Sequence, residues 1–105
     1  MSPKNITIPY NRISDFCRQW QITELALFGS ALRNDFSTGS DIDVLVTFAP
    51  EATWTLLDHV DMQDQLEEIF RRPVDLVSRR GLEQSRNHLR RQAILNSAEV
   101  IFATA

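Results

Sequence analysis

The segment from Asp41 to Phe48 constrains the fold of this chain most strongly, because its side chains alternate with the period of a strand. The β-branched residues Ile42, Val44 and Val46 stand at every second position. Residues of this type at period two are typical of a strand, in which side chains i and i+2 point to the same face. The pattern therefore predicts a strand over residues 41–48, which Pro50 ends.

The rest of the chain alternates between strand-like and helix-like patterns. Short apolar runs predict strands at 24–28 and 74–77, with a further short strand at 99–102. Apolar residues at helical spacing predict helices at 11–20, 55–70 and 82–95. The order is thus helix, strand, strand, helix, strand, helix. It favours a small mixed β-sheet with helices packed on it, in an α/β or α+β arrangement.

Specific side chains of the predicted helices are assigned to the core. Cys17 lies on the apolar face of the first helix, and Leu56, Leu57 and Val60 of the second are expected to face the core rather than a partner. In the last helix the residues expected to point inward are Leu89, Ala93 and Leu95. Both histidines, His59 and His88, are expected at the surface or on a helix face, since neither has a metal-ligating residue at suitable spacing.

Length and composition set limits on the class of protein. A chain of 105 residues suits one compact domain, spanning residues 1–105. No apolar run approaches the ~20 residues that cross a bilayer, and residues 1–9 lack the apolar core of a signal peptide. A single cysteine permits no internal disulfide. We therefore expect a cytoplasmic protein without membrane contact.

Three carboxylates on predicted strands form the first candidate for chemistry. Asp41 and Asp43 stand two apart and project from the same face of their strand. Asp75 lies within the apolar run of the third strand, where an unpaired charge is costly. If the two strands are neighbours, the three acids form a cluster that a cation would stabilise. Hard oxygen ligands of this kind suit Mg²⁺, and two ions could clamp a phosphate under attack.

A Gly-Ser turn supplies the second candidate. Gly29 and Ser30 end the first predicted strand, and ten residues separate Ser30 from Asp41. Glycine allows the backbone to approach phosphates closely, and the serine hydroxyl and nearby N–H groups can donate to phosphate oxygens. Arg33 could add a bidentate contact to a phosphate. These three residues are the candidate nucleotide-binding residues.

Most of the basic residues lie in the last third of the chain, which allows two interpretations. They are Arg71, Arg72, Arg79, Arg80, Arg86, Arg90 and Arg91. They could form a solvated helix face, or a positive rim for a triphosphate or an acidic partner. The formal net charge of −3 argues against direct binding of nucleic acid.

The Gly-Ser pair, the ten-residue interval, Asp-x-Asp and the later strand aspartate together resemble the DNA polymerase β-like nucleotidyltransferase superfamily. The similarity is greatest to its smallest branch, the minimal nucleotidyltransferase (MNT) domains. It extends over nearly the whole chain, through the segments LFGS, SDIDVLV, RRPVDLV and RRQAIL in order. One departure is Asn34, where relatives often carry glycine.

The resemblance implies a fold, an activity and a partner. It implies the polymerase β-like fold, with Gly29 and Ser30 holding the triphosphate of ATP and with Asp41 and Asp43 binding the metal ions. Asp75 would be a further metal ligand or the base for the acceptor hydroxyl. Many MNT proteins of this size are antitoxins in toxin–antitoxin systems, and they transfer AMP to a tyrosine of a HEPN-domain ribonuclease toxin (AMPylation).

Three other functions stay open at this point. The domain could neutralise the toxin by binding alone, without catalysis, as a domain can keep its acids while serving to bind. It could also transfer a nucleotide to a small molecule, although a chain of this length has little left for a second pocket. An RNA nucleotidyltransferase fits least well with the acidic balance of the chain.

Overall fold

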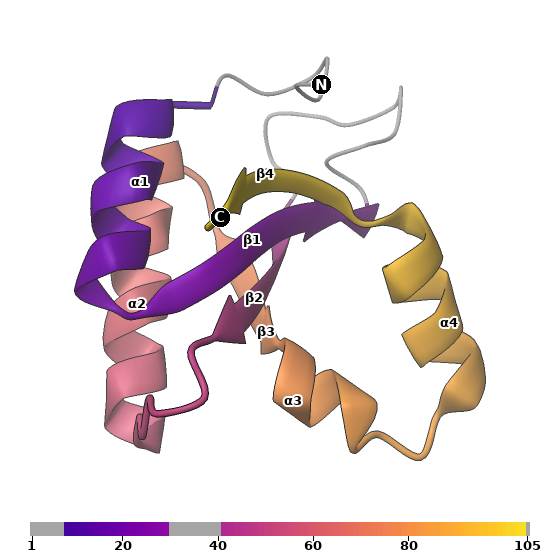
Figure 1. The fold of residues 1–105 in the computed structure, drawn as a ribbon. Coiled ribbons are helices and arrows are strands. Elements are labelled where there is room, and N and C mark those ends of the chain that lie inside the picture. Colours follow the sequence, from indigo (N-terminus) through magenta and orange to yellow (C-terminus); the bar gives the residue numbers. More distant parts are fainter. Residues whose placement is uncertain (1–7, 30–40, 105) are drawn as a thin grey trace.

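The computed structural model describes residues 8–29 and 41–104 (Figure 1). Its elements are α1 Tyr10–Gln19, β1 Ile22–Phe28, β2 Ile42–Phe48, α2 Leu56–Phe70, β3 Val74–Ser78, α3 Arg79–Glu83, α4 His88–Ser97 and β4 Glu99–Ala103. The predicted strands and the first two helices are confirmed, with the usual shifts of a few residues at their ends. The short strand at the end of the sequence is confirmed as β4.

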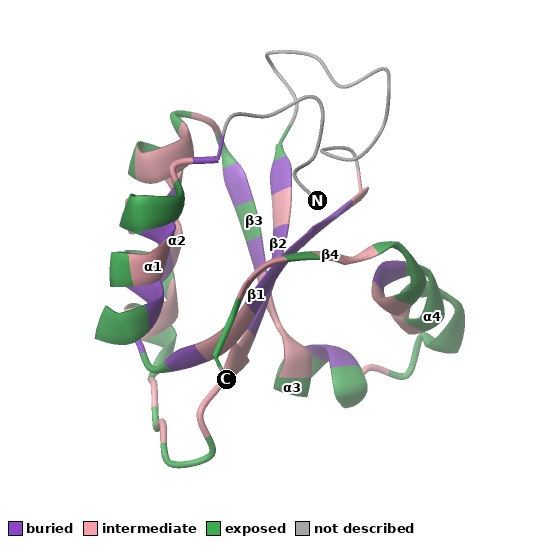
Figure 2. Cartoon of the chain, turned by 45° about the horizontal axis from the view of Figure 1, so that its top comes forward, coloured by how far each residue is buried: buried purple, intermediate pink, exposed green. Residues whose placement is uncertain are grey.

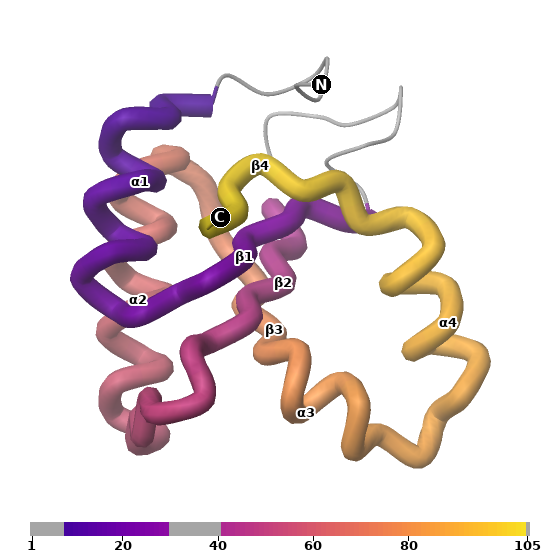
Figure 3. The backbone as a smooth tube through the Cα atoms, in the orientation of Figure 1, coloured from indigo at the N-terminus to yellow at the C-terminus, as the bar shows by residue number. Residues whose placement is uncertain are grey.

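The strands form one mixed sheet in the order β3-β2-β1-β4. β1 runs antiparallel to both β2 and β4, whereas β2 and β3 are parallel. Parallel neighbours need a crossover connection, and α2 provides it. Figure 3 follows the backbone through α3 and α4 into β4, which returns along the free edge of β1. The predicted mixed sheet with packed helices is therefore confirmed.

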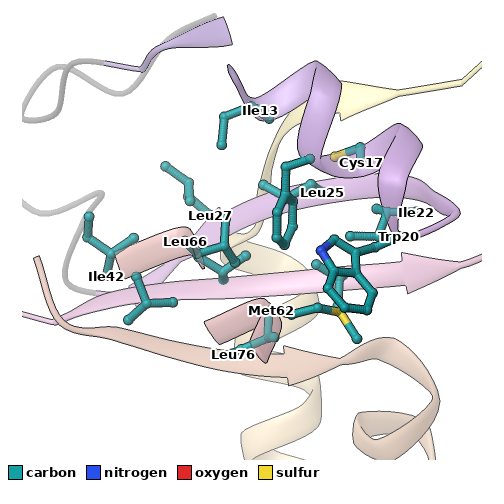
Figure 4. Close-up of a cluster of buried hydrophobic side chains, with 14 of the residues drawn as sticks. Ile13, Cys17, Trp20, Ile22, Leu25, Leu27, Ile42, Met62, Leu66 and Leu76 are labelled. Atoms are coloured by element: carbon teal, nitrogen blue, oxygen red, sulfur yellow. The ribbon is translucent and has the colours of Figure 1, made fainter. Parts of the chain in front are cut away.

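Alternate residues of each strand serve the two faces of the sheet. Ile42, Val44 and Val46 of β2 join the larger core, which α1 and α2 cover. Figure 4 shows this core around Leu25, Leu27 and Leu66, all three with no exposed surface or almost none. The opposite face carries a smaller cluster against α3 and α4, formed by Ala26, Phe28, Leu45, Leu82 and Ile94. The strand period thus separates two apolar layers.

Local contacts explain where α2 begins. The Oγ1 of Thr55 accepts from the Asp58 N–H at 3.3 Å, and Oδ2 of Asp58 accepts from the Thr55 N–H at 2.9 Å. This reciprocal capping box satisfies donors that the helix would otherwise leave free. The Trp54 indole N–H donates to the Trp20 carbonyl at 2.9 Å, and the two rings meet edge to face at 5.1 Å. Together these contacts hold the segment between β2 and α2 against the end of α1.

The last predicted helix, 82–95, is wrong as a single element, because two helices occupy this part of the chain. The side chain of Ser78 caps α3, and that of Asn87 accepts from the Arg90 N–H at 3.0 Å and starts α4 afresh. Such capping residues compete with the helix interior. The new phase turns Leu89 outward, where it is 85% exposed, and buries Ile94 instead.

Some side chains of α2 also differ from expectation. Leu56, Leu57 and Val60 are exposed rather than in the core, because α2 buries Met62 and Leu66 instead. Figure 2 colours the chain by burial, and the buried colour covers much of the strands while the helices carry much of the exposed colour. His59, on a face of α2, is half-buried, with Nε2 3.1 Å from the carbonyl oxygen of Leu76.

Two expectations about single residues are confirmed. His88 is exposed, and Cys17 is fully buried in the larger core. Burial raises the pKa of the Cys17 thiol to about 12, since the apolar surroundings disfavour the thiolate. Among the residues that the structure describes, no helix is long and apolar enough to span a membrane.

Candidate active site

The register of two parallel strands brings two of the predicted acids together. Asp43 of β2 and Asp75 of β3 are direct partners across the ladder, and neighbouring strands lie about 4.8 Å apart. Their sequence neighbours Ile42, Val44, Val74 and Leu76 belong to the larger core. The two carboxylates therefore project from the other face of the sheet, the one that α3 and α4 cover.

Gly29, directly after β1, leaves the room that the Asp43 carboxylate occupies. Its φ of 70° lies in the left-handed region that favours glycine. A Cβ built on Gly29 would overlap Oδ2 of Asp43. Any other residue would have to displace this carboxylate as well as adopt an unfavourable backbone conformation. The structure thus adds a reason for glycine here that the sequence pattern did not contain.

Both carboxylates line a hollow of about 600 Å³ between the end of the sheet and α4. Its lining residues are Phe28, Gly29, Asp43, Asp75, Arg90, Ala93, Ile94 and Ser97. Pockets that bind small molecules usually lie in the range of about 300–1,000 Å³. The hollow is therefore large enough for a nucleotide, with two acids and a cation in its walls.

The predicted site residues are distributed unevenly over this hollow. Gly29, Asp43 and Asp75 lie together in its wall. Asp41 is exposed, just before β2, and is not among the lining residues. Ser30 and Arg33 lie outside the described residues, so their roles stay predictions.

The contribution of α4 is the part that sequence reasoning missed. Arg90, Ala93, Ile94 and Ser97 stand at i, i+3, i+4 and i+7, and therefore share one face of the helix. The sequence carried a signal for this, namely the basic residues of its last third, which could form a positive rim. Without the cap at Asn87, however, the phase of α4 could not be predicted.

Whether Mg²⁺ suits this hollow depends on the side-chain oxygen atoms that are available as metal ligands. Among residues 8–29 and 41–104, no group of three or more His, Cys, Asp or Glu side chains is arranged to hold a metal ion. Mg²⁺ is usually bound by one or two carboxylates together with substrate phosphates and water. The pair Asp43 and Asp75 fits that pattern without a third protein ligand. The metal site and the number of ions stay predictions.

A second hollow, of about 350 Å³, lies between the end of β2 and α3. Its charged lining residues are Arg79, Arg80 and Glu83, and Arg79 Nε lies 3.6 Å from Glu83 Oε2. Glu83 is the one carboxylate among its described lining residues, whereas the larger hollow carries two carboxylates from adjacent strands. The hollow at Asp43 and Asp75 is the better candidate for chemistry.

A comparison with protein families identifies the class of protein to which this fold belongs. The family model described as "Nucleotidyltransferase domain" matches residues 11–101, from α1 into β4. The chain belongs to the nucleotidyltransferase domain family.

Individual relatives are similar over part of their length. The protein adenylyltransferase MntA of Thermococcus cleftensis is 34% identical over 62 residues, which cover 59% of this chain and 61% of that protein. A protein of Methanocaldococcus jannaschii to which protein adenylyltransferase activity is ascribed is 34% identical over 77 residues, covering 73% and 76%. The match to MntA thus spans about three-fifths of that relative's length.

Solved structures share the fold. A toxin–antitoxin with AMP-PNP superposes with a TM-score of 0.70 at 23% identity, covering 92% of this chain and 75% of the other. A complex of a tri-AMPylated Shewanella oneidensis HEPN toxin with its MNT antitoxin gives 0.61 at 23% identity, covering 90% and 70%. A structure ascribed to a minimal nucleotidyltransferase gives 0.66 at 31% identity, covering 86% of each chain.

Proposed function

We propose that this chain is a protein adenylyltransferase that transfers AMP from ATP to a hydroxyl group of a HEPN-domain toxin, and so acts as its antitoxin. The observation that carries the proposal is the pairing of Asp43 with Asp75 on adjacent parallel strands in the wall of one hollow. The adenylyltransferase activity of the relatives and the HEPN toxin in a structural neighbour support it.

The proposed reaction gives each residue of the hollow a task. The acceptor oxygen forms a bond to the α-phosphorus, the bond to the β-phosphate oxygen breaks, and pyrophosphate leaves. Asp43 and Asp75 would hold Mg²⁺, joined by Asp41 as the sequence motif predicts, and the ion when bound stabilises charge on the phosphate oxygens. Asp75 can accept the proton of the attacking hydroxyl, since its carboxylate lies in the same wall. Gly29 keeps the backbone clear of the Asp43 carboxylate.

A protein acceptor fits the shape of the domain. One hollow combines the paired acids with room for a nucleotide, and the hollow beside α3 has a single carboxylate among its described lining residues. A partner that presents its own tyrosine hydroxyl at the open side would complete the site without a second pocket in this chain. The same geometry makes transfer to a small molecule the weaker alternative.

The test is transfer of label to the partner. The protein would be incubated with Mg²⁺, its HEPN partner and ATP labelled at either the α- or the γ-phosphate. We expect label on the partner from α-labelled ATP only, since AMP and not phosphate is transferred. The Asp43→Asn/Asp75→Asn variant should give none, while Asp61→Asn, an exposed change on α2, should act as the wild type.

The same experiment separates the alternatives. A tight complex without label, in which the Asp43→Asn/Asp75→Asn variant still silences the toxin, would replace catalysis by neutralisation through binding. Label on a small molecule in the absence of the partner would replace the protein acceptor.

A further inference from the structure

The hollow has two sides: the strands β2 and β3 carry the acids, and one face of α4 forms the wall opposite them. Ile94, 5% exposed, packs with Phe28 and Leu45 and anchors the helix to the sheet. Arg90 and Ser97 flank it on the same face, about 10 Å apart along the helix axis for seven residues at 1.5 Å each. The face is therefore fixed at its centre and presents polar groups on either side.

The two ends of this face differ in their position along the hollow. Ser97 lies near the end of β1, because Glu99 of β4, two residues on, pairs with Leu27 of β1. Arg90 lies almost two helical turns further from that end. A ligand that extends from Gly29 along α4 would therefore meet Arg90 only if it is elongated, as a nucleoside triphosphate is.

Arg90 differs in charge from the other charged side chains that line the hollow. It is the sole cation among the described residues that line the hollow, beside the acids Asp43 and Asp75. Two carboxylates alone would repel a triphosphate. A guanidinium in the same wall counters this repulsion and can donate two parallel hydrogen bonds to one phosphate.

Arg90 also differs from the next residue in what its side chain does. Arg91 donates from Nη1 to the carbonyls of Glu83 and Ser85, at 3.2 and 3.4 Å, and so holds the turn before α4. The Arg90 side chain, by contrast, makes no hydrogen bond or ion pair with residues 8–29 and 41–104. The structure gives Arg91 a structural task and leaves the guanidinium of Arg90 available to a ligand.

From this we infer that Arg90 is a substrate-binding residue that contacts the phosphates of the nucleotide in the hollow of Asp43 and Asp75. The inference rests on the proposed nucleotidyl transfer and adds to it a phosphate contact from α4. The role requires the fork geometry of arginine, so lysine, a point charge, should replace it only in part.

The test compares binding of α,β-methylene-ATP and of adenosine, both with Mg²⁺, to the wild type and to Arg90→Gln, Arg90→Lys and Arg86→Gln. Hydrogen bonds to charged groups contribute about 1.5–3 kcal/mol, and each 1.4 kcal/mol is tenfold. Arg90→Gln should therefore weaken binding of the triphosphate roughly 10-fold to 100-fold and leave adenosine binding unchanged. Arg90→Lys should recover part of the loss. Arg86→Gln removes the same charge from an exposed position outside the hollow and should change neither affinity.

The outcomes separate this inference from the proposed function. Wild-type affinity of Arg90→Gln for α,β-methylene-ATP, in a protein that transfers AMP, would overturn the assignment of Arg90 alone. An equal loss for adenosine and the triphosphate would overturn it too, because the contact would not be to phosphate. A wild type that neither binds nucleotide nor transfers AMP would overturn the proposed function together with it. Equal melting temperatures would show that Arg90→Gln is folded, as expected for an exposed side chain.

Discussion

The face of the sheet under α1 and α2 is closed, whereas the face under α3 and α4 opens into a hollow. The closed face buries a continuous apolar core in which Ile13, Leu25, Leu27 and Leu66 have no exposed surface. The open face has a much smaller buried cluster, and the acids Asp43 and Asp75 stand beside it. The same strands serve both faces through alternate residues. One side of this small domain thus buries most of the apolar core, while the other keeps a hollow with two acids in its wall.

Substitution of a single acid of the open face should have the largest effect, and that effect should be on activity. Asp43→Asn should reduce the rate of AMP transfer roughly 100-fold to 1,000-fold or more, because charge stabilisation at the reacting phosphate is lost. The unfolding midpoint in urea should stay near that of the wild type. An unfolded variant, or one with more than a tenth of the wild-type rate, would contradict the separation of roles.

A pair of core substitutions tests the closed face against the open one. Leu66→Ala should lower the free energy of unfolding by about 2–5 kcal/mol, because it leaves a cavity in the larger core. Leu82→Ala, the same change in the smaller cluster and 4% exposed, should cost less, since few apolar neighbours surround it. Urea denaturation measures both. Equal losses would mean that the two faces contribute alike.

Gly29→Ala would disturb the open face at the point where it meets the sheet. We expect a loss of stability of about 1–2 kcal/mol from the left-handed backbone conformation. The new Cβ must also displace the Asp43 carboxylate. The rate of AMP transfer should therefore fall even under conditions in which the variant remains fully folded. Urea denaturation measures the loss of stability, and a transfer assay measures the rate. A wild-type rate would show that the position of the Asp43 carboxylate is not critical.

The smallest effect is expected at the start of α2, on the closed side. Thr55→Ala removes the hydroxyl of the capping box and should cost about 1 kcal/mol in unfolding free energy. Thr53→Ala, an exposed threonine two residues earlier, is the matched control and should cost almost nothing. The rate of AMP transfer should not change in either variant, since both lie outside the hollow.

Periodicity predicted the closed face well, because apolar alternation and helical spacing record burial directly. The strand at 41–48 and the helix at 55–70 are examples. The outward face of α2 was not, since Leu56, Leu57 and Val60 are apolar yet exposed. An apolar residue need not be buried, so composition could not locate this surface.

The open face was predictable only in part. Two acids at strand spacing and one on a later strand indicated a cluster, and the parallel register brings Asp43 beside Asp75. The wall from α4 was missed, because the sequence 82–95 reads as one helix until the cap at Asn87 is seen. A side-chain hydrogen bond to the backbone decides the phase of the following helix. Neither periodicity nor composition contains that information.

Amide chemical shifts of the folded protein, recorded with α,β-methylene-ATP and Mg²⁺, would map the nucleotide-binding site directly. We predict that the perturbed amides gather at the end of β1 near Gly29, on β2 and β3 around Asp43 and Asp75, and along α4 from Arg90 to Ser97. The outer surface of α2, around Leu57 and Asp64, should show no change. Perturbations centred on α2 or on the hollow beside α3, with none at Asp43 and Asp75, would contradict the assignment of the active site to the open face.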